Sequence, residues 1–401
     1  MQRASIPAVV AGDLNLLRCL AGRGIHSTVV AWDRREPTLR SRFAEQTFVI
    51  APPSEPDRAL ADLEQIASGF DERPILYFGQ DSLLLLVSRA RERLERRYRF
   101  SLPSADLVEM LVDKAQFADL ARRNELPIPE SVRSDELLDA RDLLTRLPLP
   151  FAFKPNVHIG WLDRRAATDR MPRKALRADT KGQAVSLYDE LSRQGPFVVQ
   201  HWVDGGEDAV LSFHAYVDAR SRMLGWFVGR KIRTYPKEAG VSTYLELVHD
   251  FEVARLGFDI VKRLGVVGPL KIDFKRDATT GRLYVLELNA RFTLWCYLGM
   301  VCGVNLPALA YADLLGLPVP DPTLYRTDIR WLSFPNDLRT FLRSYRPSKA
   351  LGLFDWLASY RSKKVYDVFS WSDPAPSAAS LLDYAQRATR RISGRSRLAT
   401  T

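Results

Sequence analysis

The first hundred residues alternate short apolar runs with segments of helical periodicity, and this alternation narrows the possible folds more than any other feature. The runs with the composition of strands lie at residues 8–11, 28–32, 48–50 and 75–78, and the helical segments lie at 14–22 and 59–67. Strands that alternate with helices indicate βαβ units around a parallel sheet. We therefore expect residues 1–105 to form a parallel α/β domain.

Polar residues follow the predicted strands at the edge where parallel sheets usually bind ligands. Gly12 and Asp13 follow the first strand, Asp33 follows the second, and residues 79–81 follow the fourth. The carboxyl ends of parallel strands meet along one edge, so these loops are candidates for ligand contact. The first strand is not followed by G-x-G-x-x-G, which argues against a dinucleotide-binding domain.

A β-hairpin is predicted near residue 280. Two apolar runs, 270–274 and 283–288, flank an Asp-Ala-Thr-Thr-Gly turn segment. Because side chains alternate along a strand, Asp273 can project from the same face as Glu287 and Asn289. Two carboxylates and an amide at one point repel unless a hard cation lies between them, and Mg²⁺ suits such ligands. The alternative is an exposed hairpin whose polar residues face water.

The composition is that of an ordinary globular protein with a basic bias. Of the 401 residues 46% are apolar and 26% charged, which suits two or three packed units. The formal net charge of +10 favours anionic partners: nucleotide phosphates, nucleic acid or anionic lipid. We expect no specific nucleic-acid partner, because the sequence contains no recognised nucleic-acid-binding motif.

Cysteine use and hydropathy predict a cytoplasmic location. Cys19, Cys296 and Cys302 are too few and too scattered for a disulfide framework or a zinc site. The first residues lack the apolar core of a signal peptide. The longest apolar stretch, 294–319, is interrupted by polar residues and proline, so we expect a buried helix pair and no transmembrane segment.

The remainder of the chain changes character twice. A helix is expected from 105 to 126, where Pro127 and Pro129 end it. Short strands follow, at residues 151–153, 197–199, 210–217 and 223–228. A helical segment then runs to about residue 320, and the tail from 321 to 401 is predicted to be helical and rich in aromatic residues, including Trp331, Trp356 and Trp371.

Two lysines stand out among the many cations. Lys154 ends an apolar strand and is followed by Pro155. A cation at the position of Lys154 has little structural role. A point charge held there suits the binding of phosphate groups. Lys114, in a Val-Asp-Lys segment that opens a helix, is by itself more typical of an ordinary surface lysine.

Four landmarks in a fixed order resemble the ATP-grasp proteins. They are Lys114, Lys154, the apolar strand 198–203 followed by Glu207, and the hairpin at 271–289. Members of this family activate a carboxylate as an acyl phosphate and transfer it to an amine or a thiol. The likeness covers roughly residues 105–315 and is greatest to the D-alanine ligase and carbamoyl-phosphate-synthase branches.

The resemblance implies a combined α/β and α+β fold. A parallel α/β pre-ATP-grasp domain is expected at 1–105, and the two lobes of the ATP-grasp domain at 106–195 and 196–320, with the metal site in the second lobe. Residues 321–401 would form a helical, aromatic and basic C-terminal extension.

The resemblance also assigns a nucleotide site. Lys114 and Lys154 would contact the phosphates, and Glu207 would bind the ribose hydroxyls. The adenine-binding connection would consist of Gln200, His201, Trp202 and Val203. The family usually has glutamate at the position of Gln200, but a glutamine carbonyl can still accept a hydrogen bond from the adenine amino group.

Metal and catalytic roles follow from the same resemblance. Asp273, Glu287 and Asn289 would hold Mg²⁺, with Mn²⁺ as the alternative ion. Lys271 would contact the transferring phosphoryl group, and Arg291 would lie near the acyl phosphate or the substrate carboxylate. Such contacts stabilise charge that develops during phosphoryl transfer.

Three further cations lie on one predicted strand. Arg230, Lys231 and Arg233 alternate along it, and Lys231 and Arg233 are expected on one face. They could clamp the γ-phosphate or an anionic substrate, which makes Arg230 a candidate catalytic residue and Lys231 a candidate nucleotide ligand. A solvated basic strand face is equally open.

The segment after Lys154 departs from the family. A Gly-rich loop usually cradles the phosphates at this point, but residues 156–175 contain the single Gly160. Five cations lie there instead: Arg164, Arg165, Arg170, Arg173 and Lys174. Side-chain charge could replace the backbone donors, with Lys174 as a nucleotide ligand, or the segment could be a mobile lid, or nucleotide use could be impaired.

The predicted function is an ATP- and Mg²⁺-dependent carboxylate–amine (or thiol) ligase with small-molecule carboxylate and amine substrates. Because of the glycine-poor segment, a non-catalytic or regulatory ATP-binding module is the alternative. The segment 381–392 could be a docked terminal helix, which is the more common case, or a basic helix at a membrane surface. The sequence does not decide whether the protein forms a homodimer.

Overall fold

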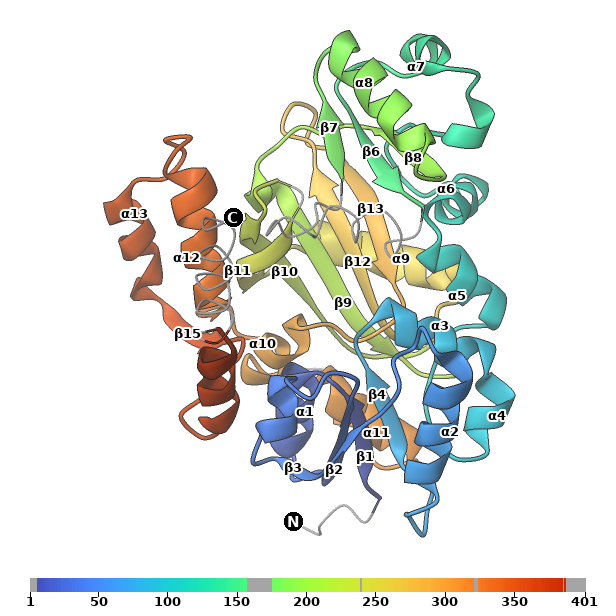
Figure 1. Ribbon diagram of the computed structural model, residues 1–401, viewed down its shortest axis with the longest axis vertical. Helices are drawn as coiled ribbons and strands as arrows, with labels where there is room; N and C mark the ends of the chain where they lie inside the picture. Colours follow the sequence, from blue (N-terminus) through green and yellow to red (C-terminus); the bar gives the residue numbers. More distant parts are fainter. Residues whose placement is uncertain (1–5, 157–174, 239, 321–323, 385, 387–401) are drawn as a thin grey trace, which may run out of the picture.

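The computed structural model describes residues 6–156, 175–238, 240–320, 324–384 and 386, and Figure 1 shows their arrangement. Three β-sheets organise these residues. One four-stranded sheet lies in the N-terminal domain, a second lies in the first lobe of the central domain, and a seven-stranded sheet lies between them in Figure 1. The α/β and α+β organisation predicted from the sequence is confirmed.

The N-terminal domain is a parallel sheet in the order β3-β2-β1-β4, as predicted. Strand β1 is fully buried, as expected of a central parallel strand. The strands are β1 (Ala8–Ala11), β2 (Ser27–Ala31), β3 (Ala44–Val49) and β4 (Ile75–Phe78). The helices are α1 (Leu14–Ala21), η1 (Pro37–Arg40), α2 (Pro56–Ala67), α3 (Asp81–Arg89) and α4 (Arg91–Glu95).

Two helices, α5 (Ala105–Val112) and α6 (Lys114–Arg123), replace the single helix predicted over 105–126. Asp113 separates them because its carboxylate accepts hydrogen bonds from the amides of Ala115 and Gln116, each at 2.9 Å. This is an N-cap, which starts a new helix instead of continuing the old one. Lys114 is thereby fixed at the first position of α6.

The first lobe is a small antiparallel sheet in the order β5-β8-β6-β7. Phe151, Phe153 and Phe197 fill its core beneath two helices. Its elements are β5 (Ser131–Arg133), η2 (Ser134–Glu136), α7 (Ala140–Arg146), β6 (Phe151–Pro155), β7 (Leu176–Ala178), α8 (Lys181–Ser192) and β8 (Phe197–His201). The predicted boundary at 195 placed β8 in the second lobe; its pairing with β5 and β6 places it in the first.

The large sheet has the order β13-β12-β9-β10-β11-β14-β15. Its seven strands are β9 (Val210–Val217), β10 (Met223–Tyr235), β11 (Val241–Val248), β12 (Gly268–Arg276), β13 (Leu283–Asn289), β14 (Ile329–Leu332) and β15 (Lys363–Tyr366). The short helix η3 (Glu207–Ala209) precedes β9. The predicted hairpin at 270–288 is confirmed as β12 and β13.

Helices cover both faces of this sheet. Helix α9 (Phe251–Leu264) approaches so closely that a Cβ at Gly257 would lie 2.6 Å from Phe213 of β9. On the other face lie α10 (Trp295–Val301) and α11 (Leu306–Leu314), the predicted buried pair. These two helices are long and apolar enough for a membrane span only when taken together, and an 89° bend separates them; among the described residues no single helix qualifies.

The C-terminal extension is wrongly predicted as purely helical. It adds β14 and β15 to the large sheet, and Trp331 on β14 is buried at 1% exposure. Its helices are α12 (Phe334–Thr340), the π-helical turn η4 (Phe341–Tyr345), α13 (Leu353–Ala358) and η5 (Ser359–Arg361), and residues 375–384 are also helical. Most of the predicted terminal helix at 381–392 lies outside the described residues.

Candidate active site

A cleft between the two lobes brings together most of the predicted nucleotide and metal residues. It is open to solvent and is lined by residues of both lobes. The predicted residues among its lining are Lys114, Lys154, Gln200, His201, Trp202, Val203, Lys231, Asp273 and Glu287. They come from strands of both sheets and from the start of α6.

The β12–β13 hairpin presents the predicted metal residues on one face. Asp273 lies directly opposite Glu287, and Lys271 lies opposite Asn289, so all four side chains point to the same side of the sheet. The Asp273 carboxylate is buried and accepts hydrogen bonds from Lys271 Nζ at 2.6 Å and from the hydroxyl of Ser212 on β9. The side chain of Asp273 is therefore held in a fixed position.

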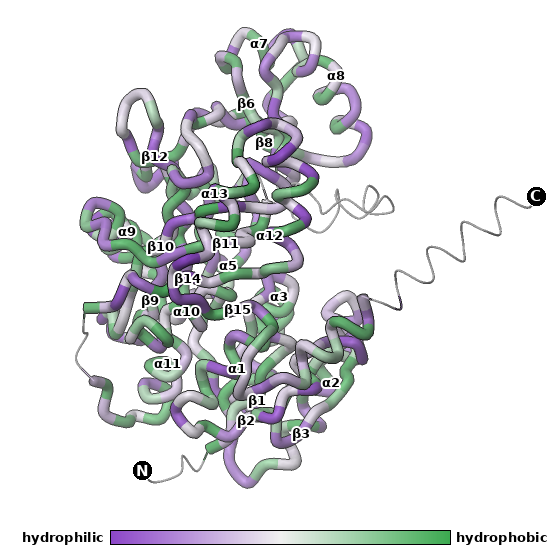
Figure 2. Tube along the Cα trace, turned by 90° about the vertical axis from the view of Figure 1, so that its left-hand side faces the viewer, coloured by the Kyte–Doolittle hydropathy of each residue, from purple (hydrophilic) through white to green (hydrophobic). Residues whose placement is uncertain are grey.

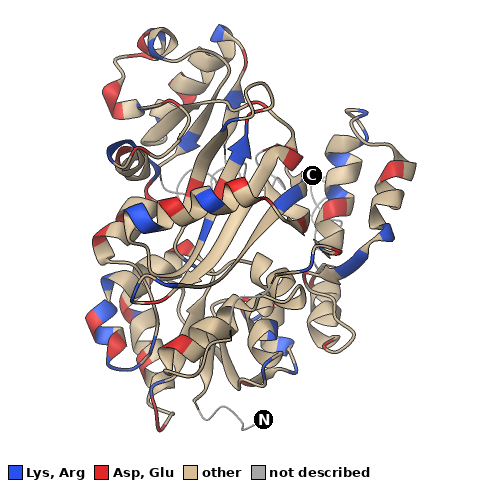
Figure 3. Ribbon diagram, turned by 180° about the vertical axis from the view of Figure 1, so that it is seen from behind, with Lys and Arg blue, Asp and Glu red and all other residues tan. Residues whose placement is uncertain are grey.

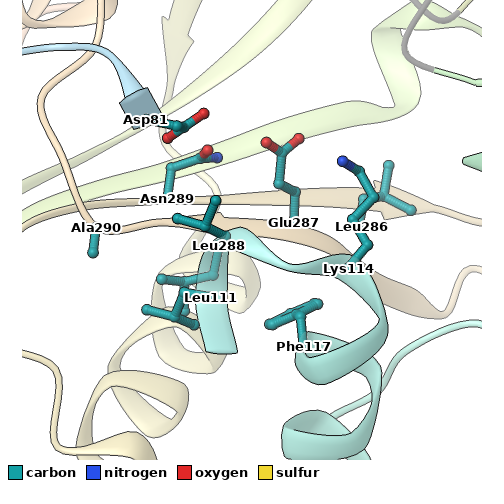
Figure 4. A pocket seen from close by; sticks show the side chains of 10 residues that line it. Asp81, Leu111, Lys114, Phe117, Leu286, Glu287, Leu288, Asn289 and Ala290 are labelled. Atoms are coloured by element: carbon teal, nitrogen blue, oxygen red, sulfur yellow. The ribbon is translucent and has the colours of Figure 1, made fainter. Parts of the chain in front are cut away.

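A second pocket adjoins the cleft and shares Lys114, Leu286 and Glu287 with it. Figure 4 shows Glu287 and Asn289 projecting from β13 to the side on which Asp81 lies. Asp81 is the first residue of α3, in the loop after β4 that was predicted to face a ligand. The N-terminal domain therefore closes one end of the site.

Arg291 connects the N-terminal domain to the predicted metal residues. Its guanidinium donates to both oxygens of Asp81, at 2.5 and 3.0 Å, and to Asn289 Oδ1 at 3.3 Å. Burial alone would lower the pKa of Arg291, but the Asp81 carboxylate outweighs it and raises that pKa. A permanently charged, oriented guanidinium thus lies beside the metal residues, which suits the binding of a carboxylate or an acyl phosphate.

Lys154 and Gln200 contact each other from adjacent strands of the first lobe. The ammonium of Lys154 on β6 donates to the side-chain oxygen of Gln200 on β8, and both residues line the cleft. The glutamine thus contacts the cation through its carbonyl, as a neutral partner. A glutamate at this position would neutralise part of the charge of Lys154.

Trp202 lies between two cations at the cleft wall. Arg177 of β7 lies 4.7 Å and Lys275 of β12 lies 4.8 Å from the centroid of its ring. Burial lowers the pKa of Lys275. These cation–π contacts join the two lobes through one indole ring and fix its orientation.

The connection after β8 has most of its amides engaged within the protein. The His201 amide donates to the Glu130 carbonyl at 2.8 Å, and the Trp202 amide donates to the Pro150 carbonyl at 2.9 Å. The Val203 amide has no acceptor among the described residues, although Val203 lines the cleft. The Val203 amide is thus a backbone donor that takes part in neither of the two sheets.

The structure does not bring Glu207 into the cleft. Its carboxylate accepts hydrogen bonds from the hydroxyl of Thr234 and from the Glu238 amide at 3.0 Å. Burial raises the pKa of Glu207, and these hydrogen bonds oppose the rise. Glu207 therefore holds the turn after β10, which itself contributes Glu238 and Gly240 to the cleft lining.

Arg230 is also placed away from the cleft, contrary to its predicted catalytic position. It lies on the opposite face of β10 from Lys231 and pairs with Glu246 of β11 at 3.0 Å. Glu246 also binds Arg330 of β14 at 2.9 Å. The three side chains form a structural ion pair network on the far face of the sheet.

Lys231 and Arg233 do not share a face either. The pairing of β10 with β11 shifts on both sides of Arg233, and such bulges break the alternation of side chains. Lys231 therefore reaches the cleft, whereas Arg233 is buried at 3% exposure against Asp337 of α12. Arg233 is excluded as a substrate ligand by this burial.

Leu286 lines the cleft, although the alternation of side chains along β13 would turn it away from the face that carries Glu287. Asp273 pairs with Glu287, but Phe274 pairs with Val285, so Leu286 lies in a bulge. Both Leu286 and Glu287 consequently face the cleft. Lys275 and Ala152 also line it; each lies two residues from a predicted site residue, so alternation along the strand is the signal that points to them.

Some predictions lie outside the part of the chain that the structure describes. These are Lys174 and most of the glycine-poor segment, residues 157–174. Within the described ranges, no cluster of three His, Cys, Asp or Glu side chains can hold a metal ion. The predicted magnesium set does not require one, because it consists of two carboxylates and the amide of Asn289.

Comparisons with known proteins agree with this arrangement. No family model matches the chain. The D-aspartate ligase of Enterococcus faecium is 21% identical over 58% of this chain and 56% of its own length. The C-terminal section of the carbamoyl phosphate synthase large chain of Methanopyrus kandleri is 24% identical over 62% of this chain and 46% of its own. The chain thus spans about half the length of the curated relatives it matches.

Solved structures show the same fold. The N5-carboxyaminoimidazole synthetase of Staphylococcus aureus, solved with ADP, superposes with a TM-score of 0.62 over 81% of this chain and 82% of its own, at 11% identity. The Staphylococcus aureus synthetase and the two curated relatives are members of the ATP-grasp superfamily. The chain has the ATP-grasp fold, and the resemblance predicted from its sequence is confirmed.

Proposed function

We propose that the protein is an ATP-dependent carboxylate–amine, or less readily carboxylate–thiol, ligase. ATP would phosphorylate a substrate carboxylate, and an amine would displace phosphate from the acyl phosphate, releasing ADP and phosphate. One observation carries the proposal. The interlobe cleft gathers three lysines (114, 154 and 231) around one end of the Asp273–Glu287 pair, and Arg291 lies at the other end.

The adenosine half of ATP fits the wall formed by β8 and its connection. The Val203 amide can donate to the adenine ring, and the Leu286 side chain offers an apolar surface for the base. Glu207 is assigned no contact with the ribose, because it is not among the residues that line the cleft. The connection rather than Glu207 therefore carries adenosine recognition.

The phosphates would lie between Lys114, Lys154 and Lys231. These ammonium groups come from α6, β6 and β10, and all three residues line the cleft. Charge held in place before the reaction stabilises the transferring phosphoryl group without reorganisation.

The hairpin residues fit a magnesium ion. Asp273, Glu287 and Asn289 supply oxygen donors from one sheet face, the donor type that Mg²⁺ prefers, with Mn²⁺ as the alternative ion. When bound, the ion would neutralise charge on the phosphate oxygens. Lys271 lies next to this set, bound to Asp273, and can donate to the transferred phosphoryl group from there.

The substrate carboxylate would bind at the Arg291 end. A carboxylate oxygen attacks the γ-phosphorus and ADP leaves; the amine nitrogen then attacks the acyl carbon, phosphate leaves with the bonding electron pair, and the nitrogen loses a proton. Arg291, oriented by Asp81, would hold the carboxylate during the first step. Small-molecule substrates suit the second pocket, which Asp81 and Asn289 line.

A Lys154→Met protein tests the nucleotide placement. We expect its affinity for ATP to fall by about tenfold or more, because removal of a charged hydrogen bond costs roughly 1.5–3 kcal/mol. Calorimetric titration with the ATP analogue AMP-PNP and Mg²⁺ measures this change. Lys181→Met, on the exposed start of α8, is the matched control and should bind like the native protein. Equal affinities in the two variants would contradict the placement.

The sequence between residues 156 and 175 supports a second candidate function. With one glycine in place of a Gly-rich phosphate loop, the chain could bind ATP without turning it over, as a regulatory module. Such a module predicts ATP binding that is equally sensitive to Lys154→Met but no ADP release with any carboxylate. Turnover therefore separates the two functions, whereas binding does not.

A further inference from the structure

The C-terminal hairpin, which we define as residues 334–364, exposes unusually large apolar side chains. Nine of the seventeen exposed large hydrophobic side chains among the described residues lie between 334 and 384. Phe354 is 85% exposed, and Leu353 and Leu357 on the same short helix, α13, are about half exposed, as is Leu342 on η4. Clustered exposed apolar residues mark interaction surfaces, whereas scattered ones do not.

The same hairpin carries an excess of positive charge. It contains seven Lys and Arg residues against two carboxylates, and one of the two, Asp337, is fully buried against Arg233. Four of the cations are exposed and have no carboxylate within ion-pair distance among the described residues: Arg343, Arg346, Lys349 and Arg361. Figure 3 shows blue segments on the helices of this hairpin, at the right of the view.

Some surface arginines elsewhere pair with nearby carboxylates, whereas others, such as Arg34, Arg141 and Arg193, have no ion pair among the described residues. Arg89 pairs with Glu109, and Arg93 with Glu64. Further pairs are Arg133–Asp135, Arg146–Asp142, Arg177–Asp179, Arg263–Asp259 and Arg276–Asp250. Unpaired cations are thus not confined to the hairpin; what marks the hairpin is that such cations occur together with the exposed apolar side chains of α13.

A small aromatic core holds the helices that carry these exposed side chains. Phe341 and Trp356 stack with their ring centroids 4.6 Å apart, and Tyr345 completes a small core between the two arms of the hairpin. Asp337 ties this core to β10 through Arg233, at 2.8 Å, and to β11 through Thr243, also at 2.8 Å. The side chains of α13 are thus held in fixed positions. In Figure 2 helix α13 lies on the side of the molecule that faces the viewer.

We propose that the C-terminal hairpin docks on an anionic lipid bilayer. Phe354, Leu353 and Leu357 would enter the boundary between headgroups and acyl chains, and Arg343, Arg346 and Lys349 would contact the anionic headgroups. An apolar side-chain group flanked by unpaired cations is the arrangement that binds such surfaces. The surface is distinct from the nucleotide cleft, so this docking does not depend on the proposed ligase function.

The apolar tip favours lipid over a nucleic acid. Phosphate backbones would satisfy the cations but would leave the Leu353, Phe354 and Leu357 side chains in water, with no base-stacking groove around them. A bilayer satisfies both kinds of group at once. Docking would place the proposed ligase site near a membrane surface.

Vesicle sedimentation tests the proposal with the full-length protein. Vesicles of phosphatidylcholine and phosphatidylglycerol in equal amounts are compared with vesicles of phosphatidylcholine alone. We expect at least tenfold tighter binding to the anionic vesicles and a large loss of binding in 0.5 M NaCl, where charge interactions are screened. Absence of binding to the anionic vesicles would overturn the proposal.

Two hairpin variants locate the surface. Phe354→Ser with Leu357→Ser removes apolar side chains, and Arg343→Ser with Arg346→Ser and Lys349→Ser removes cations; each should weaken anionic-vesicle binding at least tenfold. Matched controls should stay within twofold of the native protein: Leu138→Ser, which is 89% exposed in the first lobe, and Lys181→Ser with Arg193→Ser and Lys262→Ser.

Two outcomes would assign the binding elsewhere. If Arg390→Ser with Arg391→Ser abolishes vesicle binding and the hairpin variants do not, the hairpin assignment is wrong. If polyuridylate binds more tightly than the anionic vesicles and the Phe354→Ser with Leu357→Ser variant leaves its binding unchanged, the surface is a nucleic-acid site and the proposal fails.

Discussion

A Glu287→Gln protein is expected to lose nearly all of the gain in ATP affinity that Mg²⁺ provides. Loss of a group that only orients a metal ligand already costs roughly 10–100-fold in metal affinity, so loss of a ligand carboxylate should cost at least as much. The substitution keeps the size of the side chain. Glu287 is partly exposed on β13, so the fold should be unaffected.

Calorimetric titration of AMP-PNP with and without Mg²⁺ measures this loss. Binding without Mg²⁺ should differ little between the native and Glu287→Gln proteins, because the lysines proposed to contact the phosphates remain. Glu252→Gln, at an exposed position on α9, is the matched control. If Mg²⁺ strengthens binding equally in all three proteins, the assignment of Glu287 to the metal is wrong.

An Asp337→Ala protein should be destabilised by about 3–5 kcal/mol, the usual effect of removing one partner of a buried ion pair. Asp337 is fully buried and accepts hydrogen bonds from Arg233, Thr243, Trp356 and Tyr360. Its removal leaves the guanidinium of Arg233, at 3% exposure, without a counter-charge. The free energy of unfolding from urea titration measures the effect.

Asp355→Ala provides the control within the same hairpin. Asp355 is exposed on α13, and the described residues place no cation within ion-pair distance of it, so its loss should change the free energy of unfolding by less than about 0.5 kcal/mol. If the two alanine variants are equally stable, the Asp337 network does not anchor the extension to the sheet.

Local patterns were sufficient to predict the β12–β13 hairpin. The positions of Asp273, Glu287 and Asn289 follow from a period of two along each strand and from one turn between the strands. The βαβ alternation of the first hundred residues is equally local, and it predicted a parallel sheet whose 79–81 loop reaches the site through Asp81. In both regions the pattern of apolar residues in the sequence follows the order and side-chain alternation of the secondary structure that forms.

Bulges and long-range partners limited the remaining predictions. A bulge turns Leu286 into the cleft, and two shifts on β10 send Arg233 away from it. Pairing between strands, not the spacing of residues within a strand, decides such shifts. The tail was assigned to helix because its aromatic residues carry no information about their partners, and the contact of Asp337 with Arg233 spans 104 residues.

The central claim is the transfer of phosphate from ATP to a carboxylate. Hydroxylamine traps acyl phosphates as hydroxamates, so a library of amino acids, peptides and sugar acids can be incubated with the protein, Mg·ATP and hydroxylamine. We expect at least one carboxylate to give ADP and hydroxamate in equal amounts, and we expect Glu287→Gln to abolish both. ATP binding with no carboxylate-dependent ADP release above that of Glu287→Gln would contradict a ligase and favour the regulatory module.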